Sequence, residues 1–261
     1  MKVVILCGGK GTRLREETEF RPKPMLPIGT RPILWHIMKY YATQGHSEFI
    51  LCLGYKGEMI KEYFRNYRWT QGDVTVSLGA GAAPEFHDTH GEEDWKVTLA
   101  ETGEDSMTAF RVRQIERHLG GDDEFLLTYG DGVGNMDIGN VIQTHRDQKA
   151  VCTLTGVHPP GRFGELRIES KSKVVAFNEK PQAEGGYING GYMVCSREIF
   201  RYLPDDPGMM LERRPMDEMI RDGRLAVCPH EGFWQPMDTF QEFQLLNQLW
   251  KEERAPWKIW S

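Results

Sequence analysis

A buried-strand pattern runs directly into a glycine-rich turn near the start of the chain, and this pairing constrains the fold more than any other feature. Residues 2–7 form a short, mostly apolar run of the kind that makes a fully buried strand. Gly8, Gly9 and Gly11 follow, and they allow the backbone to approach a ligand because glycine carries no Cβ atom. Successive backbone N–H groups in such a loop form a concavity that binds anions. The stretch therefore predicts a phosphate site at the end of a strand.

Two cations lie close behind the glycine turn. Arg13 follows it, and Lys23 stands between Pro22 and Pro24, which stiffen the backbone around the lysine. Fixed positive charges of this kind suit phosphate oxygens. The glycine spacing matches neither the dinucleotide-binding fingerprint nor the P-loop, and the acid expected further on is absent. We interpret the segment as a site for a nucleoside triphosphate; the alternative for Lys23 is an ordinary solvated lysine.

Length and charge narrow the class of protein. The chain has 261 residues, 39% of them apolar, which is enough for the core of one large α/β domain. Its net charge is −6 and it has no basic block, which argues against a nucleic-acid surface. No apolar run approaches the ~20 residues of a membrane span. The first strand begins at once and leaves no room for a signal peptide, so we expect a cytoplasmic protein without a membrane partner.

The five cysteines support the same location. They are far apart and odd in number, each lies in or beside an apolar run, and no C-x-x-C pair occurs. We expect buried free thiols in a reducing cytosol, in preference to disulfides or a structural metal.

Strand and helix patterns alternate along most of the chain, which indicates a largely parallel sheet covered by helices. Proline at the start and glycine after the end mark the first helix. The alternation of strand and helix patterns stops at residues 70–104, which are rich in Gly, Glu, Asp and His. We therefore expect a surface excursion there, reaching either a neighbouring subunit or the site. The predicted helices are 33–41, 57–67, 107–119, 138–148, 196–203, 215–221 and 240–250, and the strands are 2–7, 49–53, 74–76, 97–99, 124–129, 150–157, 165–168, 174–177, 192–195 and 225–228.

Two aspartates follow apolar runs. Asp131 comes at the end of a predicted buried strand, where open α/β sheets bind ligands, and Asp238 follows residues 233–237. Two carboxylates that meet over a triphosphate would suit Mg²⁺, which takes few protein oxygens and completes its shell with phosphate. The alternative for either residue is a helix N-cap, and Asp238 does precede a helix.

Three polar connectors complete the candidates: residues 161–164, 178–181 and 189–191. Turn chemistry alone explains stretches of this composition. Their carboxylate, lysine and amide are also what a sugar phosphate requires. Arg111 lies in a predicted helix and, taken alone, reads as a solvated side chain.

Taken together, these segments resemble the sugar-1-phosphate nucleotidylyltransferases. The agreement is strongest with members that use CTP, and it covers the whole chain apart from residues 70–104. The segments that carry it are 4–13, 22–25, 32–38, 54–57, 60–64, 128–133, 159–164, 179–181, 188–191, 232–239 and 255–260.

The resemblance implies a Rossmann-like, mixed and mostly parallel sheet flanked by helices, of the nucleotide-diphospho-sugar transferase type. It implies a single domain with a nucleotide-binding half, 1–135, and a sugar-phosphate-binding half, 136–261. The implied reaction joins CTP and α-D-glucose 1-phosphate to give CDP-glucose and pyrophosphate, with Mg²⁺, for glycan or deoxysugar synthesis. Family members assemble into symmetric oligomers, so a homo-oligomer is implied as well.

The resemblance also implies a role for each matching residue. Arg13 and Lys23 are catalytic: Arg13 stabilises the departing pyrophosphate and Lys23 the α-phosphate. Asp131 and Asp238 hold the metal. The residues implied to bind nucleotide are Leu6, Gly8, Gly9, Gly11, Thr12, Arg13, Lys23, Ser106, Arg111 and Gly130, and those implied to bind the sugar phosphate are Gly164, Glu179, Lys180, Asn189 and Gly190.

Two departures from the family pattern bear on substrate choice. Ala109 and Phe110 replace two glycines beside the nucleotide pocket, which predicts added bulk and, if positive φ is needed there, backbone strain. Residues 209–212 replace a Thr-Trp-Glu segment. UTP, dTTP or another hexose 1-phosphate therefore stay open as substrates, since such changes shift selectivity by only ~1–3 kcal/mol. Rival functions are a non-catalytic sugar-nucleotide-binding subunit and, more weakly, a nicotinamide dehydrogenase.

Overall fold

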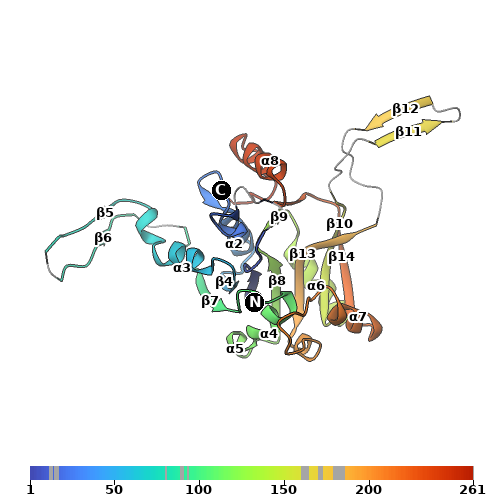
Figure 1. Ribbon diagram of the computed structural model, residues 1–261, viewed down its shortest axis with the longest axis horizontal. Coiled ribbons are helices and arrows are strands. Elements are labelled where there is room, and N and C mark those ends of the chain that lie inside the picture. Colours follow the sequence, from blue (N-terminus) through green and yellow to red (C-terminus); the bar gives the residue numbers. More distant parts are fainter. Residues whose placement is uncertain are drawn as a thin grey trace.

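A seven-stranded sheet forms the centre of the computed structural model, with strand order β14-β10-β13-β8-β1-β4-β7 (Figure 1). The structure describes residues 1–11, 14, 18–79, 81–88, 91–92, 94–159 and 186–260, together with the backbone of 165–169 and 173–178. The strands of the sheet are β1 (Val3–Leu6), β4 (Glu48–Leu53), β7 (Lys96–Glu101), β8 (Glu124–Tyr129), β10 (Cys152–Val157), β13 (Ile188–Ser196) and β14 (Leu225–His230).

The sheet is mixed and mostly parallel. β1 lies between β4 and β8 and runs parallel to both, and the pairs β4–β7 and β10–β14 are parallel as well. β13 runs antiparallel to its two neighbours, β8 and β10. Strands of this kind are buried on both faces and read as continuous apolar runs. The predicted fold class is confirmed.

Side chains of β1 alternate between two cores, as the period of a strand requires. Val3 and Ile5 face the core covered by α2, α6 and α8, whereas Val4 and Leu6 face the core that α4, α5 and α7 cover. The helices are α2 (Ile33–Thr43), α3 (Gly57–Arg65), α4 (Thr108–Gln114), α5 (Glu116–Leu119), α6 (Ile138–Gln148), α7 (Arg214–Arg221) and α8 (Phe240–Lys251).

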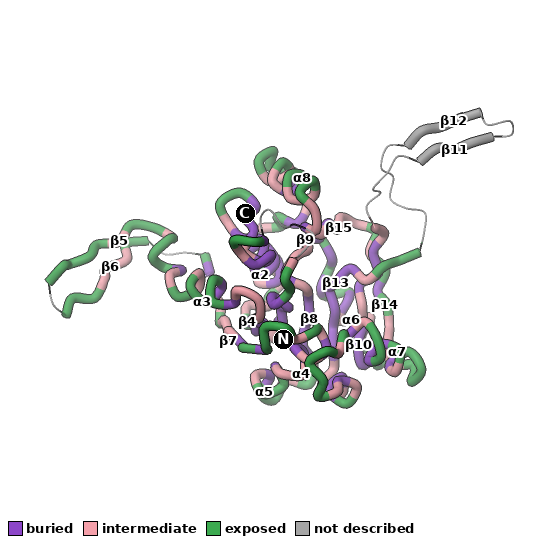
Figure 2. Tube along the Cα trace, in the orientation of Figure 1, coloured by how far each residue is buried: buried purple, intermediate pink, exposed green. Residues whose placement is uncertain are grey.

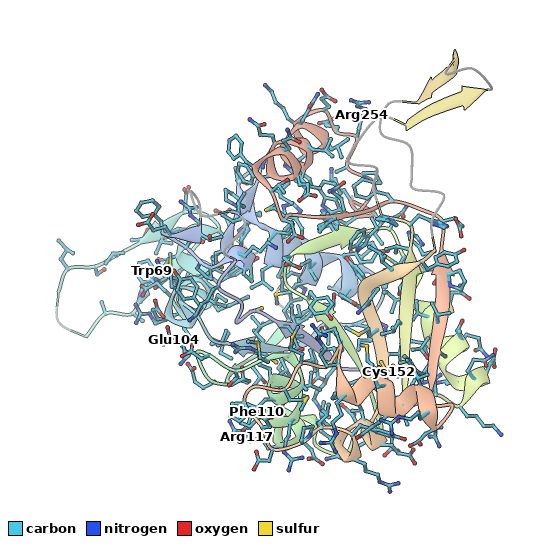
Figure 3. All side chains as sticks on the ribbon, turned by 45° about the vertical axis from the view of Figure 1, so that its right-hand side comes forward. Trp69, Glu104, Phe110, Arg117, Cys152 and Arg254 are labelled. Carbon is cyan, nitrogen blue, oxygen red and sulfur yellow. The ribbon has the colours of Figure 1, made fainter. Side chains whose placement is uncertain are left out.

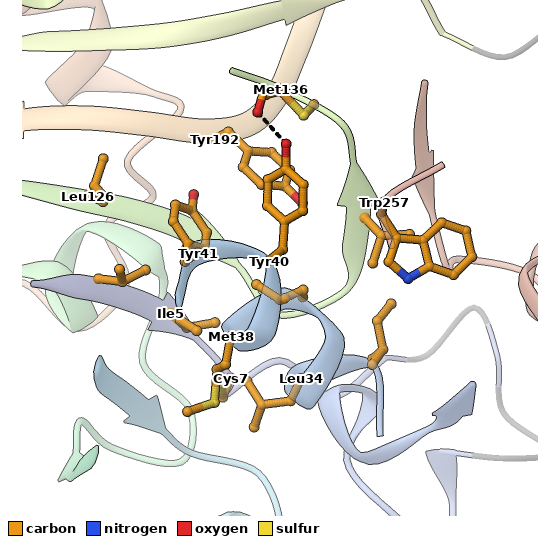
Figure 4. Packing of buried hydrophobic residues seen from close by; sticks show 14 of the residues in the cluster. Ile5, Cys7, Leu34, Met38, Tyr40, Tyr41, Leu126, Met136, Tyr192 and Trp257 are labelled. Atoms are coloured by element: carbon orange, nitrogen blue, oxygen red, sulfur yellow. Dashed lines mark hydrogen bonds between the residues drawn. The ribbon is translucent and has the colours of Figure 1, made fainter. Parts of the chain in front are cut away.

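Aromatic side chains join α2 to the sheet in the first core (Figure 4). Tyr41 stacks on Tyr192 of β13, with ring centroids 5.7 Å apart, and the Tyr40 hydroxyl donates to the carbonyl of Met136. Trp257 is fully buried against the same core. The segment after α8 is therefore held to the body of the fold by apolar burial.

The remaining elements are short, and two of the predicted helices differ from those in the structure. The predicted helix 107–119 divides into α4 and α5 at Ile115, and the helix predicted near 196–203 is the 3-10 helix η4 (Arg197–Arg201). The remaining elements are η2 (Lys23–Met25), η3 (Arg68–Thr70), β2 (Pro27–Ile28), β3 (Arg31–Pro32), β5 (Val74–Thr75), β6 (Glu85–Phe86), β9 (Gly132–Gly134), β11 (Glu165–Glu169), β12 (Lys173–Asn178) and β15 (Trp234–Pro236).

The excursion is shorter than the predicted 70–104. Strands β5 and β6 form a hairpin that extends away from the body and is largely exposed (Figures 1 and 2). Residues 96–101, in contrast, form β7, which pairs in parallel with β4 at the edge of the main sheet. The prediction of one continuous excursion is wrong because the strand predicted at 97–99 pairs with β4, a contact that no local pattern shows.

All five cysteines are buried and free. Among the helices that the structure describes, none has both the length and the apolar character to cross a membrane.

Candidate active site

A cavity of about 290 Å³ opens where the carboxyl ends of β1 and β8 meet. This is the edge at which open α/β sheets bind ligands, because the connections diverge there. Predicted nucleotide-binding residues supply much of its wall. The described residues that line it are Leu6, Cys7, Gly8, Gly9, Gly11, Lys23, Pro24, Ser106, Met107, Thr108, Arg111, Tyr129, Gly130 and Asp131.

Lys23 lies in this wall between two carboxylates. Its Nζ is 2.7 Å from Asp131 Oδ2, and it also donates a hydrogen bond to Asp238 Oδ1. The side chain is buried, so desolvation alone would lower the pKa of the ammonium, but the two carboxylates together raise that pKa above its ordinary value. The alternative of a solvated surface lysine is excluded.

A small ladder brings the two aspartates together although 107 positions separate them (238 − 131). Asp131 directly precedes β9, Asp238 follows β15, and these strands pair with Pro236 opposite Gly132. The Met237 N–H donates to the carbonyl of Asp131 at 2.8 Å. The pairing thus places both carboxylates on Lys23 through backbone hydrogen bonds.

Asp238 is not the N-cap of α8. Thr239 occupies that position, and its hydroxyl accepts from the Glu242 N–H in a capping box. Glu242 Oε2 accepts from the N–H groups of both Asp238 and Thr239, each at 2.7 Å. The cap therefore orients the Asp238 backbone and leaves its carboxylate available to Lys23.

The two carboxylates fit a divalent ion of the magnesium type. They converge on one cationic group, which shows that their oxygens reach a common point. Among the described residues no group of three or more His, Cys, Asp or Glu side chains could hold a metal without help. An ion bound to Asp131 and Asp238 would complete its shell with phosphate and water, which is the usual Mg²⁺ pattern.

Arg111 supports the glycine turn from beneath. Its side chain is buried, and its guanidinium donates to the carbonyls of Leu53 at 2.9 Å and Gly8 at 3.1 Å. Further bonds reach Thr102 Oγ1 at 2.9 Å and the Glu104 carbonyl at 3.1 Å. Burial lowers the pKa of the guanidinium. The interpretation of Arg111 as a solvated side chain is wrong, because the helix that carries it packs on one face of the sheet and the guanidinium is buried against backbone carbonyls.

Two glycines make room for that guanidinium. A Cβ atom on Gly8 would lie 2.1 Å from Arg111 Nη1, and one on Gly54 would lie 2.5 Å from the same atom. Glycine at both positions leaves the space that the guanidinium occupies, and no role was predicted for Gly54. Its place directly after a buried strand was the available signal.

The sugar-side residues are only partly described. Asn189 lies in β13, and its Nδ2 donates to the Tyr129 hydroxyl at 3.4 Å, while Gly190 accepts from Trp234 Nε1 at 2.7 Å. Neither residue lines the cavity, but Asn189 contacts Tyr129, which does. The other predicted site residues, Thr12, Arg13, Gly164, Glu179 and Lys180, lie outside the described residues.

The departures at Ala109 and Phe110 do not strain the fold. Both residues are inside α4, and neither has a positive φ. The cavity wall takes Ser106, Met107, Thr108 and Arg111 from this segment and omits Ala109 and Phe110. Figure 3 labels Phe110 in the lower part of the view, near Arg117. The expected bulk beside the pocket is therefore absent.

Comparison with known proteins identifies the class. Residues 2–249 match the family model described as nucleotidyl transferase, and the chain belongs to that family. It is 45% identical over 261 residues to the glucose-1-phosphate cytidylyltransferase of Salmonella typhi, and equally to that of Salmonella typhimurium, with 100% of both chains covered in each case. The resemblance found in the sequence is confirmed, and the protein is a nucleotidyltransferase.

A solved structure supports the fold. The crystal structure of HddC from Yersinia pseudotuberculosis, complexed with GMP-PN, superposes with a TM-score of 0.68 at 22% identity, covering 95% of this chain and 99% of that one. At this identity the likeness concerns the fold alone.

Proposed function

We propose that the protein transfers a cytidylyl group from CTP to α-D-glucose 1-phosphate and so makes CDP-glucose and pyrophosphate. The observation that carries the proposal is the contact of Lys23 with both Asp131 and Asp238 at the glycine-lined cavity. The full-length identity of 45% to glucose-1-phosphate cytidylyltransferases supports the choice of substrates.

The reaction brings two anions together. An oxygen of the sugar phosphate attacks the α-phosphorus of CTP, a P–O bond forms, and the bond to the pyrophosphate oxygen breaks without a covalent enzyme intermediate. Cations must offset the repulsion between the phosphates, and positioning supplies most of the rest. In this proposal Lys23 contacts the α-phosphate and the backbone N–H groups of Gly8, Gly9 and Gly11 cradle the phosphates; all four residues line the same cavity. We keep the predicted role of Arg13 in stabilising pyrophosphate, with Thr12 in the phosphate cradle.

Nucleotidyl transferases generally use a divalent metal ion. We propose that the ion here is Mg²⁺ and that Asp131 and Asp238 hold it. When bound, it would neutralise phosphate charge during the transfer. The two carboxylates also argue against a binding subunit without catalysis, which would need neither.

The proposal keeps the predicted division of the chain into two halves. Residues 1–135 would hold the nucleotide and residues 136–261 the sugar phosphate, with Gly164, Glu179, Lys180, Asn189 and Gly190 at the sugar. The fate of the product in glycan or deoxysugar synthesis and a cytoplasmic location remain part of this proposal; buried free thiols are compatible with the latter.

A homo-oligomer is part of the proposal too. The β5–β6 hairpin extends from the body and exposes Val76 and Leu78, the latter 97% accessible. Exposed apolar side chains on a projecting hairpin suit a second copy of the chain. Light scattering on Leu78→Lys should show a smaller assembly than the unaltered protein, whereas Ile220→Lys on α7 should not.

The test of the reaction is pyrophosphate release with CTP, UTP, dTTP, ATP and GTP, each combined with glucose 1-phosphate and with other hexose 1-phosphates. CTP with glucose 1-phosphate should give the highest kcat/KM. Asp131→Asn and Asp238→Asn should lower kcat by at least ~100-fold, whereas Asp147→Asn, an exposed residue of α6, should not. Equal rates with all nucleotides would overturn the cytosine assignment, and full activity of both aspartate variants would overturn the metal site.

A further inference from the structure

Two hydrogen-bond chains converge on the carboxylate of Glu212, next to the wall of the cavity. In the first, Asn189 Nδ2 donates to the Tyr129 hydroxyl at 3.4 Å, and that hydroxyl donates to Glu212 Oε1. In the second, the Leu211 N–H donates to Thr108 Oγ1 at 2.8 Å, and that hydroxyl donates to Glu212 Oε2 at 2.7 Å. Tyr129 and Thr108 line the cavity, and Glu212 lies behind them.

The direction of each bond is determined by its partners. A carboxylate only accepts, so both hydroxyl protons point to Glu212. Asn189 Oδ1 accepts from the Gly191 N–H at 2.9 Å, which leaves the Nδ2 group to donate to Tyr129. A backbone N–H can only donate to Thr108. Each hydroxyl therefore has its proton in use and retains acceptor capacity alone.

Packing holds the tyrosine in this arrangement. Gly191 has a φ of +80°, and a Cβ there would lie 2.5 Å from Tyr129 Cδ2, so the ring rests directly on the β13 backbone. The segment before Glu212 is joined to α4 through the Met107 N–H and the Pro207 carbonyl at 2.8 Å, and through the Ala109 N–H and the Met209 carbonyl at 3.2 Å. These backbone bonds hold residues 207–212 against α4, and the buried Leu211 side chain packs in the core beside that helix.

We propose that Glu212 is a positioning residue that makes the Tyr129–Thr108 wall a hydrogen-bond acceptor for a hydroxyl group of the hexose. The proposal rests on the proposed function and assigns its sugar end. Phosphates are held at the glycine turn and Lys23, whereas this wall adjoins β13, the strand that carries Asn189. A wall that only accepts selects a group that donates, and a hexose hydroxyl does so.

The test combines a protein change with a substrate change. Glu212→Gln keeps the shape but replaces one carboxylate oxygen with an amide that cannot accept, so one of the two hydroxyls loses its acceptor. Glucose 1-phosphate and its 2-, 3-, 4- and 6-deoxy analogues are compared, and 2′-deoxy-CTP and 3′-deoxy-CTP are the nucleotide arm. Tyr129→Phe and Thr108→Val remove each hydroxyl separately, and Glu218→Gln on α7 is the matched carboxylate control.

We expect Glu212→Gln to raise the KM for glucose 1-phosphate about tenfold, with the KM for CTP and the unfolding temperature unchanged. With the unaltered protein, one deoxy sugar phosphate should have a much lower kcat/KM than glucose 1-phosphate. The ratio of these two kcat/KM values should be smaller in Glu212→Gln and in either Tyr129→Phe or Thr108→Val. Glu218→Gln should behave as the unaltered protein.

Three results would overturn the inference. The first is an unchanged KM for the sugar phosphate in Glu212→Gln. The second is that the effects of the protein substitution and of the missing sugar hydroxyl simply add. The third is that the effects are non-additive only with the deoxy nucleotides. If Glu212→Gln does not fold, Tyr129→Phe and Thr108→Val decide the matter in the same way. Failure of the proposed function is a separate observation, because the unaltered protein would then release no pyrophosphate from CTP and glucose 1-phosphate.

Discussion

The Lys23 ammonium lies 2.7 Å from the carboxylate of Asp131 and holds Asp238 with the same nitrogen. A lysine and a divalent ion cannot occupy the same point between two carboxylates, because both carry positive charge and both need those oxygens. If Asp131 and Asp238 hold a divalent ion, as proposed, we expect the Lys23 ammonium to compete with that ion for their negative charge.

Lys23→Met should therefore raise the affinity of the nucleotide-free protein for Mn²⁺ by about tenfold or more, since a competing charge is removed at a partly buried site. Turnover should fall at the same time, because the α-phosphate loses its cation. The measurement is Mn²⁺ titration followed by electron paramagnetic resonance, with Lys39→Met, whose partner is Glu92, as control. Unchanged Mn²⁺ affinity in Lys23→Met would show that the lysine does not compete.

Gly54→Ala should destabilise the protein by about 1–3 kcal/mol, because the added methyl displaces the Arg111 guanidinium from the Leu53 and Gly8 carbonyls. In an Arg111→Ala background the methyl has room, and the same substitution should cost less than ~1 kcal/mol. Urea unfolding of the four proteins measures this coupling. Gly121→Ala, where no atom lies within 4 Å of the new Cβ, is the control. Additive effects would mean that Arg111 does not fill the space at Gly54.

Glu242→Ala should lower both stability and activity. Its carboxylate accepts from the N–H groups of Asp238 and Thr239, so its loss weakens the helix cap by about 1 kcal/mol and frees the Asp238 backbone. Thr239→Ala removes the cap hydroxyl but leaves both of those bonds, so it should lower stability while keeping kcat. Urea unfolding and pyrophosphate release on both variants separate the two effects. Equal losses of kcat would contradict the assigned role of Glu242.

His36 should make the fold sensitive to acid. It is fully buried, its Nε2–H donates to the Ile28 carbonyl at 3.0 Å, and its Nδ1 accepts from Trp257 Nε1 at 3.4 Å, so the neutral ring is the form that fits. Burial, with a smaller contribution from Arg31, lowers the pKa of His36 to about 4. The unfolded chain binds the proton first, and stability should therefore fall by roughly 3 kcal/mol between pH 6.5 and pH 4.

The measurement is urea unfolding at a series of pH values. His36→Gln should lose this part of the pH dependence, and His87→Gln, an exposed histidine of the hairpin, should retain it. A parallel pH dependence of His36→Gln and the unaltered protein would assign the acid sensitivity to other groups.

Local patterns were sufficient for most of the architecture. The strand at 124–129 and the helix at 138–148 were predicted with the bounds that the structure shows, because apolar periodicity and flanking glycines act within a few residues. The bounds of the excursion were not, because a strand was predicted at 97–99 but no local pattern showed that it pairs with β4 in the main sheet. The glycine turn and Lys23 could be recognised as candidates from the sequence, because the glycines and the prolines beside Lys23 constrain the backbone locally.

Spatial relations between distant segments were beyond any local pattern. Which atoms Lys23 contacts depends on a ladder between β9 and β15, and the burial of Arg111 depends on how α4 packs on the face of the sheet. Glu212 had no motif to mark it, because its role comes from meeting Tyr129 and Thr108 from another part of the chain. Periodicity and turn chemistry determine the elements, whereas contacts between side chains far apart in sequence arise only when those elements pack.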